Sequence, residues 1–394
     1  MPEVWDSWVP GVLSKRQLKA VHKAGFIKHA SSGGFDHSAL DLHLSSDAFE
    51  LKGGSVKPFG SDYFGQITSD RLLNPLVADQ NGHFLLRPRR TYLFRLKESI
   101  EAKCTKSIWG RATAKSSIGR LDVLVRLIVD GTRRYEGFDP EELGEGSTSM
   151  FVEVTPITFP VVVKAGIALN QLRLFYGDPA DCELKGHEIS RTCLTQLAKD
   201  HHLSVNLAPV DIVGVPGCGF RATSPNRFGA PIRLWSGGNG ELNPGKWWEL
   251  VGANQQRRLK IQKGSFYILR SKERLRLPAG IAVYARAIDE EIGEMRIHYA
   301  GFAHPFFGQD REDGQLGTPL VFEVRGHDVD VNLRDGEILA RLQFFRMSEE
   351  AKKERKNPAR SVSKKKDPYN DQDLQLSKFF AKWKSRPKLV QQGK

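Results

Sequence analysis

Long apolar runs are missing from this 394-residue sequence. No uninterrupted apolar stretch approaches the roughly 20 residues that a membrane-spanning helix needs, and residues 1–17 lack the basic and then apolar build of a signal peptide. Cysteine is also scarce: Cys104, Cys182, Cys193 and Cys218 are scattered without a C-x-x-C pair, so neither a zinc knuckle nor a redox dithiol is indicated. We therefore expect a cytoplasmic protein with no membrane partner.

The common nucleotide-binding motifs of α/β proteins are missing too. The sequence has no G-x-x-x-x-G-K-[ST], and no G-x-G-x-x-G that opens a helix. A helical pattern is confined to residues 12–27, with Ser14 as the N-cap and Gly25 as the stop, and to residues 188–200. The rest reads as short strands separated by turns, at residues 37–44, 90–96, 121–129, 150–155, 159–163 and 167–175. Repeated short strands predict an all-β barrel or sandwich.

Most of the chain carries little net charge, although the whole sequence has a formal charge of +13. Residues 351–394 hold 14 Lys or Arg against 4 Asp or Glu, so this tail contributes +10 and leaves +3 for the rest. Residues 349–366 are charged and read as a linker. Residues 367–383 regain Leu374, Leu376, Phe379, Phe380 and Trp383, which makes this end of the tail a candidate lid.

The second half of the chain repeats the first. Residues 153–154, 166, 172 and 175 recur as residues 323–324, 336, 342 and 345, and each difference (323−153, 336−166, 342−172, 345−175) is 170. A constant offset over separated positions indicates an internal repeat. We therefore divide the chain into an N-terminal domain at 1–178, a connection at 179–207, a degenerate second domain at 208–348, and the linker with its closing segment at 349–394.

A polar cluster directly precedes a β-type apolar run within residues 112–131. Its core, K-S-S-I-G-R at residues 115–120, is called the KSSIGR motif below. Lysine offers a point charge, arginine a planar fork for two phosphate oxygens, and the hydroxyls neutral donors, so the motif suits a di- or triphosphate. A basic, serine-rich turn can also be only a solvated turn. The second copy, at residues 289–294, reads D-E-E-I-G-E and is unsuited to the same anion.

Carboxylates supply the remaining candidates. Glu153 lies inside an apolar strand, where burial raises a carboxyl pKa and fits it to act as a general base on water. The alternative is that Glu153 lies on the solvent face of a half-exposed strand. Asp41 and His43 share one polar strand face, as surface or as support for a turn, and Asp130-Gly131 is foremost a turn signal.

The sequence resembles a known family at several of these positions. The KSSIGR motif looks like the [RK]-S-S-x-x-R signature of dCTP deaminases, in particular the long bacterial form with two fused dUTPase-like domains. The strand with Glu153 and the downstream residues 159–161, 166 and 171–172 resemble the strand of the catalytic glutamate and the segment after it. Tyr369 and residues 374–378 are similar to the C-terminal segment that closes over the nucleotide. The loop at residues 131–149 departs from the family, because it is longer and more acidic.

The resemblance implies a fold and an activity. The fold is all-β: two tandem dUTPase-like distorted β-barrel (jelly-roll-like) domains with a few short helices. The activity is hydrolysis of dCTP to dUTP and ammonia without zinc, and the H-x-E…P-C-x-x-C pattern of zinc deaminases is missing. Glu153 would be the base, and Mg²⁺ would be bound through the phosphates. The residues expected to bind the nucleotide are Lys115, Ser116, Ser117, Arg120, Asp130, Gln171, Tyr369 and Lys378.

Family members build trimeric sites from neighbouring β-domains, so the resemblance also implies a homo-oligomer. Two alternatives stay open. One is a dUTP pyrophosphatase, or a bifunctional enzyme, on the same scaffold. The other is a β-barrel that binds nucleic acid through the basic tail. We disfavour nucleic acid because the charge of the body is nearly balanced and aromatic residues are not clustered on one strand pair.

Overall fold

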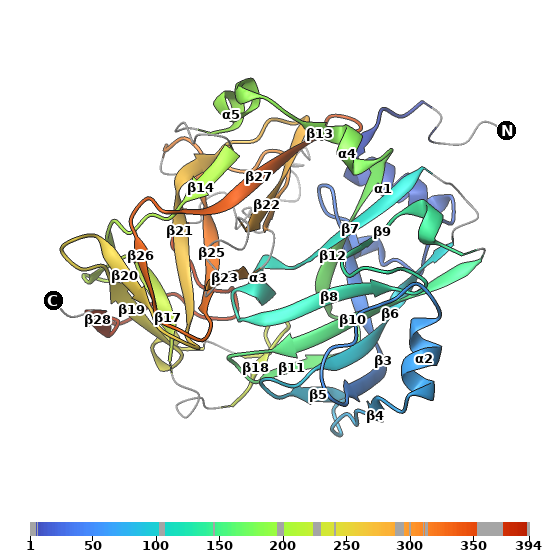
Figure 1. The fold of residues 1–394 in the computed structure, drawn as a ribbon, viewed down its shortest axis with the longest axis horizontal. Helices are drawn as coiled ribbons and strands as arrows, with labels where there is room; N and C mark the ends of the chain where they lie inside the picture. Colours follow the sequence, from blue (N-terminus) through green and yellow to red (C-terminus); the bar gives the residue numbers. More distant parts are fainter. Residues whose placement is uncertain are drawn as a thin grey trace, which may run out of the picture.

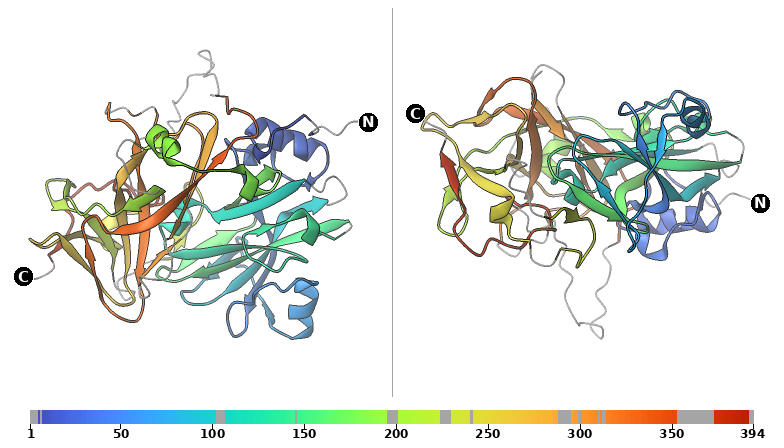
Figure 2. Two further views of the ribbon diagram at one scale, coloured as in Figure 1. Left: turned by 45° about the horizontal axis from the view of Figure 1, so that its top comes forward. Right: turned by 90° about the horizontal axis from the view of Figure 1, so that it is seen from below.

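Two β-rich lobes lie side by side in the computed structural model (Figures 1 and 2). The structure describes residues 5, 7–101, 107–144, 146–194, 201–223, 230–239, 242–287, 295–298, 301–309, 311, 314–352 and 373–391. Strands dominate both lobes, and the helices are short. The all-β prediction is therefore confirmed. No helix in these described ranges is long and apolar enough to cross a membrane.

The N-terminal lobe is a strongly curved antiparallel sheet. Helix α1 (Lys15–Lys23) precedes it, and the Ser14 side chain accepts a hydrogen bond from the Gln17 amide in a capping box, so the predicted N-cap is confirmed. Along the sheet the strands follow the order β8 (Val123–Val129), β10 (Ser147–Pro156), β6 (Tyr92–Glu101), β3 (Leu40–Leu51), β12 (Ala168–Tyr176), β7 (Ile108–Ala114) and β9 (Gly137–Phe138). Burial alternates over the first five residues of β8, as the period of a strand requires, and its last two residues are buried as well.

The C-terminal lobe repeats this pattern. Strand β12 at 168–176 corresponds to β27 (Ile338–Arg346), and β11 (Val161–Lys164) to β26 (Val331–Arg334), each with an offset of 170 (338−168, 331−161). Gly166 and Gly336 have nearly equal positive φ angles, 84° and 83°, at the turns that join β11 to β12 and β26 to β27. The internal repeat is thereby confirmed. The acidic copy of the KSSIGR motif, residues 289–294, lies outside the described residues.

The remaining strands of the C-terminal lobe form two main sheets. One contains β21 (Phe266–Leu275), β25 (Thr318–Gly326), β23 (Met295–His298), β17 (Gly219–Ala222), β19 (Trp248–Gly252) and β28 (Leu389–Gln391). In the other, β27 pairs with β22 (Ile281–Ala287), β13 (Glu183–Leu184) and β14 (His202–Ser204), and β24 (Gly301–Ala303) pairs with β22. Helix α5 (His187–Cys193) begins one residue before the helix predicted at 188–200. Residues 195–200 of that prediction lie outside the described residues.

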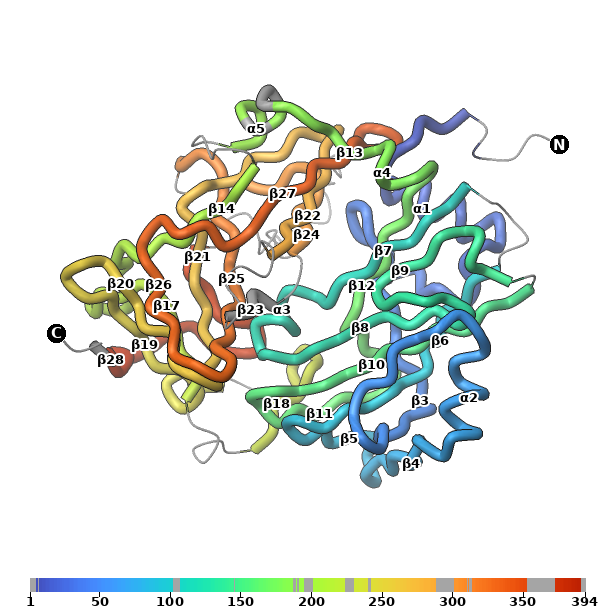
Figure 3. The backbone as a smooth tube through the Cα atoms, viewed as in Figure 1, coloured from blue at the N-terminus to red at the C-terminus, as the bar shows by residue number. Residues whose placement is uncertain are grey.

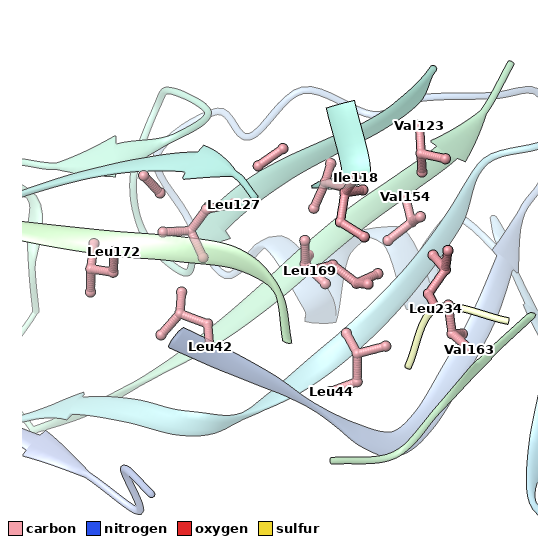
Figure 4. Packing of buried hydrophobic residues seen from close by; sticks show 14 of the residues in the cluster. Leu42, Leu44, Ile118, Val123, Leu127, Val154, Val163, Leu169, Leu172 and Leu234 are labelled. Carbon is pink, nitrogen blue, oxygen red and sulfur yellow. The ribbon is translucent and has the colours of Figure 1, made fainter. Parts of the chain in front are cut away.

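The lobes share a strand pair and a core. Strand β18 (Ile232–Arg233), from the C-terminal half, pairs in parallel with β11 of the N-terminal lobe, with Ile232 opposite Val161. Leu234 continues into the N-terminal core beside Val163 (Figure 4). At the other end of the chain β28 pairs with β19 (Figure 3). The two lobes are therefore joined by the β18–β11 pair and by a common core, as well as by the connection in sequence.

The C-terminal segment packs into the junction. The ring of Phe380 lies 6.0 Å from Trp248, 6.1 Å from Trp247 and 6.5 Å from Phe159, measured between centroids. Phe159 comes from the N-terminal lobe and both tryptophans from the C-terminal lobe. The aromatic end of the tail thus buries apolar surface against both lobes at once.

Candidate active site between the two lobes

The KSSIGR motif forms one helical turn at the centre of the molecule (Figure 1). Strand β7 ends at Ala114, Lys115 caps helix α3 (Ser116–Gly119), and the chain turns into β8. Ile118 is 1% exposed and is buried in the core of the N-terminal lobe (Figure 4). Because this apolar side chain is inserted inward, the polar side chains of Lys115, Ser116 and Arg120 line a cavity between the lobes.

Lys115 is held in a network of polar side chains. Its Nζ lies 2.5 Å from Asp41 Oδ2, and Gln171 Nε2 donates a 3.0 Å hydrogen bond to Asp41 Oδ1. Behind them, the buried Arg173 donates a 2.8 Å hydrogen bond to Thr113 Oγ1. The network orients the lysine toward the cavity and brings Lys115 and Gln171 together, as expected. Asp41, which reads from the sequence as surface or turn support, takes part in the site.

A carboxylate from the C-terminal lobe faces the motif. Glu323, on β25, places Oε1 4.0 Å from Nε of Arg120. A β-carbon added at Gly119 would come 3.1 Å from Glu323 Oε2, so the missing side chain of this glycine leaves room for the carboxylate. Burial raises the pKa of Glu323 to about 8, against a lowering effect of Arg120. A carboxyl group with such a pKa is suited to exchange protons near neutral pH.

A second cross-lobe pair fixes the motif against this strand. Arg325 Nη1 lies 2.5 Å from Oδ2 of the fully buried Asp122, and its Nη2 donates a 3.0 Å hydrogen bond to the Gly264 carbonyl. Thr158 also donates to Asp122. Asp122 has a φ of 57°, in the left-handed region that aspartate tolerates better than most residues. The ion pair therefore joins the end of the motif to the strand of Glu323.

The other walls of the cavity are apolar or aromatic. Phe302, Phe307, Leu320 and Val321 come from the C-terminal lobe, and Arg173 lies 3.7 Å above the ring centroid of Phe302. Cations on one side and apolar surface on the other suit a ligand that has both an anionic and a flat, less polar part.

The predicted base, Glu153, lies in a different environment. Its carboxylate forms an ion pair with Arg126, and accepts hydrogen bonds from Tyr135 Oη at 3.2 Å and from the Val56 amide at 3.3 Å. The solvent-face alternative does not describe it, because Glu153 is 1% exposed. The structure therefore does not bring Glu153 to the KSSIGR motif; that place is taken by Glu323.

The other expected nucleotide-binding residues divide between the cavity and its surroundings. Lys378 lines the cavity, where burial and the nearby Lys115 lower its pKa. Ser117 is buried, and its carbonyl accepts a 2.6 Å hydrogen bond from Ser377 Oγ. Asp130 instead accepts a 2.8 Å hydrogen bond from the Tyr63 amide, as its turn context suggests. Tyr369 lies outside the described residues.

A signal for Glu323 was present in the sequence. It is the repeat partner of Glu153 at the offset of 170 and is likewise a carboxylate inside an apolar strand, at the end of L-V-F-E at residues 320–323. What the pattern could not tell is which lobe supplies the carboxylate to the motif, because that depends on how the two lobes pack.

The fold and the cavity define a class: a tandem β-domain protein with cationic side chains beside a buried carboxylate, without a P-loop or a Rossmann turn in its sequence. Comparison with family models places the chain within this class. Residues 9–178 match the N-terminal domain of 2′-deoxycytidine 5′-triphosphate deaminase, and residues 196–380 match its C-terminal domain. The chain belongs to the dCTP deaminase family, whose members hydrolyse the amino group of the cytosine ring.

A solved structure agrees with this assignment. The crystal structure of 2′-deoxycytidine 5′-triphosphate deaminase from Agrobacterium tumefaciens is 26% identical, covers 87% of this chain and 99% of its own, and superposes with a TM-score of 0.75. The comparison with curated proteins gives no match.

Proposed function

We propose that dCTP is deaminated in the cavity between the lobes, with Glu323 as the general base. The observation that carries this proposal is the placement of the Glu323 carboxylate 4.0 Å from Arg120 of the KSSIGR motif. Lys115, Ser116 and Arg120 bind the triphosphate, and the apolar wall of the C-terminal lobe receives the nucleoside. Glu153 has no part in the chemistry on this proposal.

The reaction needs one water and one proton carrier. The Glu323 carboxylate takes a proton from the water, and the oxygen forms a bond to C4 of the cytosine ring. The carboxyl group delivers this proton to N3 of the ring, which leaves a tetrahedral C4 that carries a hydroxyl and an amino group. The carboxylate then takes the hydroxyl proton and passes it to the amine, so the C4–N bond breaks, C4=O forms and ammonia leaves. The products, dUTP and ammonia, contain all the atoms of dCTP and water. A pKa of about 8 allows both proton transfers at one group.

The substrate is proposed to arrive as its Mg²⁺ complex. Among the described residues, no group of three His, Cys, Asp or Glu side chains is placed to hold a metal ion, and the Asp41 carboxylate is already engaged by Lys115 and Gln171. This donor set suits an ion bound through the phosphates. Zinc independence, a cytoplasmic location and self-association stay predictions.

A matched pair of variants tests the assignment of the base. Glu323→Gln keeps the shape of the side chain but lacks a group that can accept the proton, so ammonia release from dCTP is expected to disappear while dCTP binding persists. Glu153→Gln removes the partner of Arg126, and is expected to lower Tm while ammonia release continues. Loss of ammonia release in Glu153→Gln, with release retained in Glu323→Gln, would instead identify Glu153 as the base. Following uracil nucleotides and pyrophosphate in the same assay separates deamination from dUTP pyrophosphatase activity.

A further inference from the structure

The two glutamates occupy equivalent positions on equivalent strands. Glu153 lies opposite Leu93 across the β10–β6 pair, and Glu323 lies opposite Ile268 across the β25–β21 pair. The offsets are 170 for the glutamates (323−153) and 175 for their partners (268−93). Side chains two positions apart lie on the same face of a strand. Phe151 therefore lies on the face of Glu153, and Val321 on the face of Glu323.

Each domain thus has one glutamate-bearing face, but the two faces are covered differently. In the N-terminal lobe, residues 52–72, called the covering segment here, fold back over β10. Phe64, from helix α2 (Tyr63–Ser69), stacks on Phe151 with ring centroids 5.2 Å apart and planes 5° apart. Together with the hydrogen bond from Val56 to Glu153, this contact closes the face.

The corresponding connection in the C-terminal lobe takes another course. Strand β3 is followed by the covering segment and then by β4 (Leu73–Pro75), whereas β17 is followed by β18 and then by β19. Because β18 pairs with β11 of the other lobe, this part of the connection crosses the junction. The face of Glu323 is covered by α3 of the N-terminal lobe instead, as the contacts of Gly119 and Arg120 with Glu323 show.

We infer that each chain has one active site, which is complete within that chain, and that the covering segment closes the face on which a second site would form. The inference rests on the proposed role of Glu323. The N-terminal lobe supplies the motif, the C-terminal lobe supplies Glu323, and the C-terminal segment supplies Lys378 and the Ser377 contact to Ser117. For another chain to present its KSSIGR motif to Glu153, Phe64 and Val56 would first have to leave Phe151 and Glu153.

Complementation between two inactive chains tests this inference. Lys115→Met and Glu323→Gln are given different affinity tags and produced together, and the material that carries both tags is isolated. If sites are complete within a chain, this mixed material releases no more ammonia than either variant alone. If chains share sites, every mixed dimer contains one intact site and activity returns, which would overturn the inference. Failure to recover doubly tagged material means that the chains do not associate, which also supports sites within one chain.

Two controls distinguish a negative complementation result from failure of the proposed function. Wild-type chains produced with Glu323→Gln chains should stay active in proportion to their share. A wild-type protein that releases no ammonia, or an active Glu323→Gln variant, would overturn the proposed function and not the arrangement of the site.

The number of ligands bound gives an independent measurement. Calorimetric titration of dCTP into Glu323→Gln, and of the product dUTP into the wild type, should each saturate at one nucleotide per chain. Two nucleotides per chain in either titration would mean that the Glu153 face also binds nucleotide, and would overturn the inference.

Discussion

Two glutamates with the same sequence context have different chemistry in this chain. Glu153 sits beside Arg126, which forms an ion pair with it and lies 4.1 Å from the ring centroid of Tyr135. Glu323 is buried with its Arg120 partner at 4.0 Å, and its pKa is raised because burial outweighs the attraction of the arginine. Glu153 is thus engaged in an ion pair, whereas the raised pKa of Glu323 makes that carboxylate a better proton acceptor.

The raised pKa predicts the pH dependence of the reaction. Below a pH of about 8 the Glu323 carboxyl group is protonated and can no longer take the proton of water. We therefore expect kcat/KM for dCTP to rise about tenfold per pH unit on the acid side and to level off above it, as for a single essential base. Initial rates of ammonia release across this range measure it. A flat profile between pH 6 and pH 9 would contradict the role of Glu323.

The same group predicts how stability varies with pH. Its pKa is about 8 in the folded protein against an ordinary value of 4.5, so between these values the folded state binds more protons than the unfolded state. The free energy of unfolding contributed by this group therefore falls as pH rises from about 5 to about 8. Glu323→Gln stays neutral and should show a flatter dependence in urea denaturation, with Glu153→Gln as the comparison. Equal slopes for wild type and Glu323→Gln would contradict the burial of an ionisable group here.

At the scale of single residues, much of the candidate site could be predicted from the sequence. The chemistry of the KSSIGR motif predicted a phosphate-binding role for Lys115 and Arg120, and the structure places both at the cavity with Gln171 and Lys378. The base could not be chosen in the same way. A glutamate in an apolar strand satisfies the pattern in either half, and only the packing of the lobes decides which carboxylate meets the motif.

At the scale of elements, local signals were the reliable ones. The N-cap at Ser14 and the β-type run of β8 depend on neighbours in sequence, and both predictions held. Strand β18 has no such signal, because two residues cannot show a period. Its partner β11 is in the other lobe, so its pairing follows from tertiary packing alone.

The ion pair between Asp122 and Arg325 predicts a coupled loss of stability and activity. Arg325→Met leaves the carboxylate of Asp122 buried without its cation, which should cost about 3–5 kcal/mol of stability. It also frees the strand of Glu323 from the end of the motif, so kcat should fall. Urea denaturation and ammonia release measure the two effects.

A second substitution separates charge from packing at this pair. Asp122→Asn tolerates the left-handed backbone and removes the charge, so the double variant Asp122→Asn with Arg325→Met should recover part of the lost stability. Strict additivity of the two single changes would argue that they do not interact.

At the scale of the whole molecule, the C-terminal segment holds the lobes together around the site. Ending the chain after Lys352 would expose Trp247 and Trp248, which are 2% and 0% exposed in the intact protein, and would remove Lys378. We expect a loss of roughly 2–5 kcal/mol of stability, in the range for deleting large buried side chains, and weaker binding of dCTP. Denaturation and calorimetry provide the measurements.

A single substitution serves as the control for this truncation. Lys378→Ala removes the cation but keeps the aromatic contacts, so KM for dCTP should rise while Tm stays near that of the wild type. A truncated chain as stable as the intact one would show that the tail is not part of the packed structure.

The repeat, visible in sequence as a constant offset, predicted two similar domains. It could not predict that a strand of the second half pairs with the first lobe, nor that the site would lie between the lobes, because an offset describes each copy and not the relation between copies. The relation between the lobes is visible only where the two copies differ. The covering segment folds over its own lobe, whereas β18 pairs with the other lobe.

The pairing of β18 with β11 also affects how the chain is made. Ile232 follows Val161 by 71 residues (232−161), and at a ribosomal rate of roughly 5–20 residues per second the free edge of β11 waits roughly 4–14 seconds for its partner. An unpaired strand edge is a template for joining other chains. During that interval nascent chains on neighbouring ribosomes have matching open edges, and an N-terminal domain released alone would keep its edge open indefinitely.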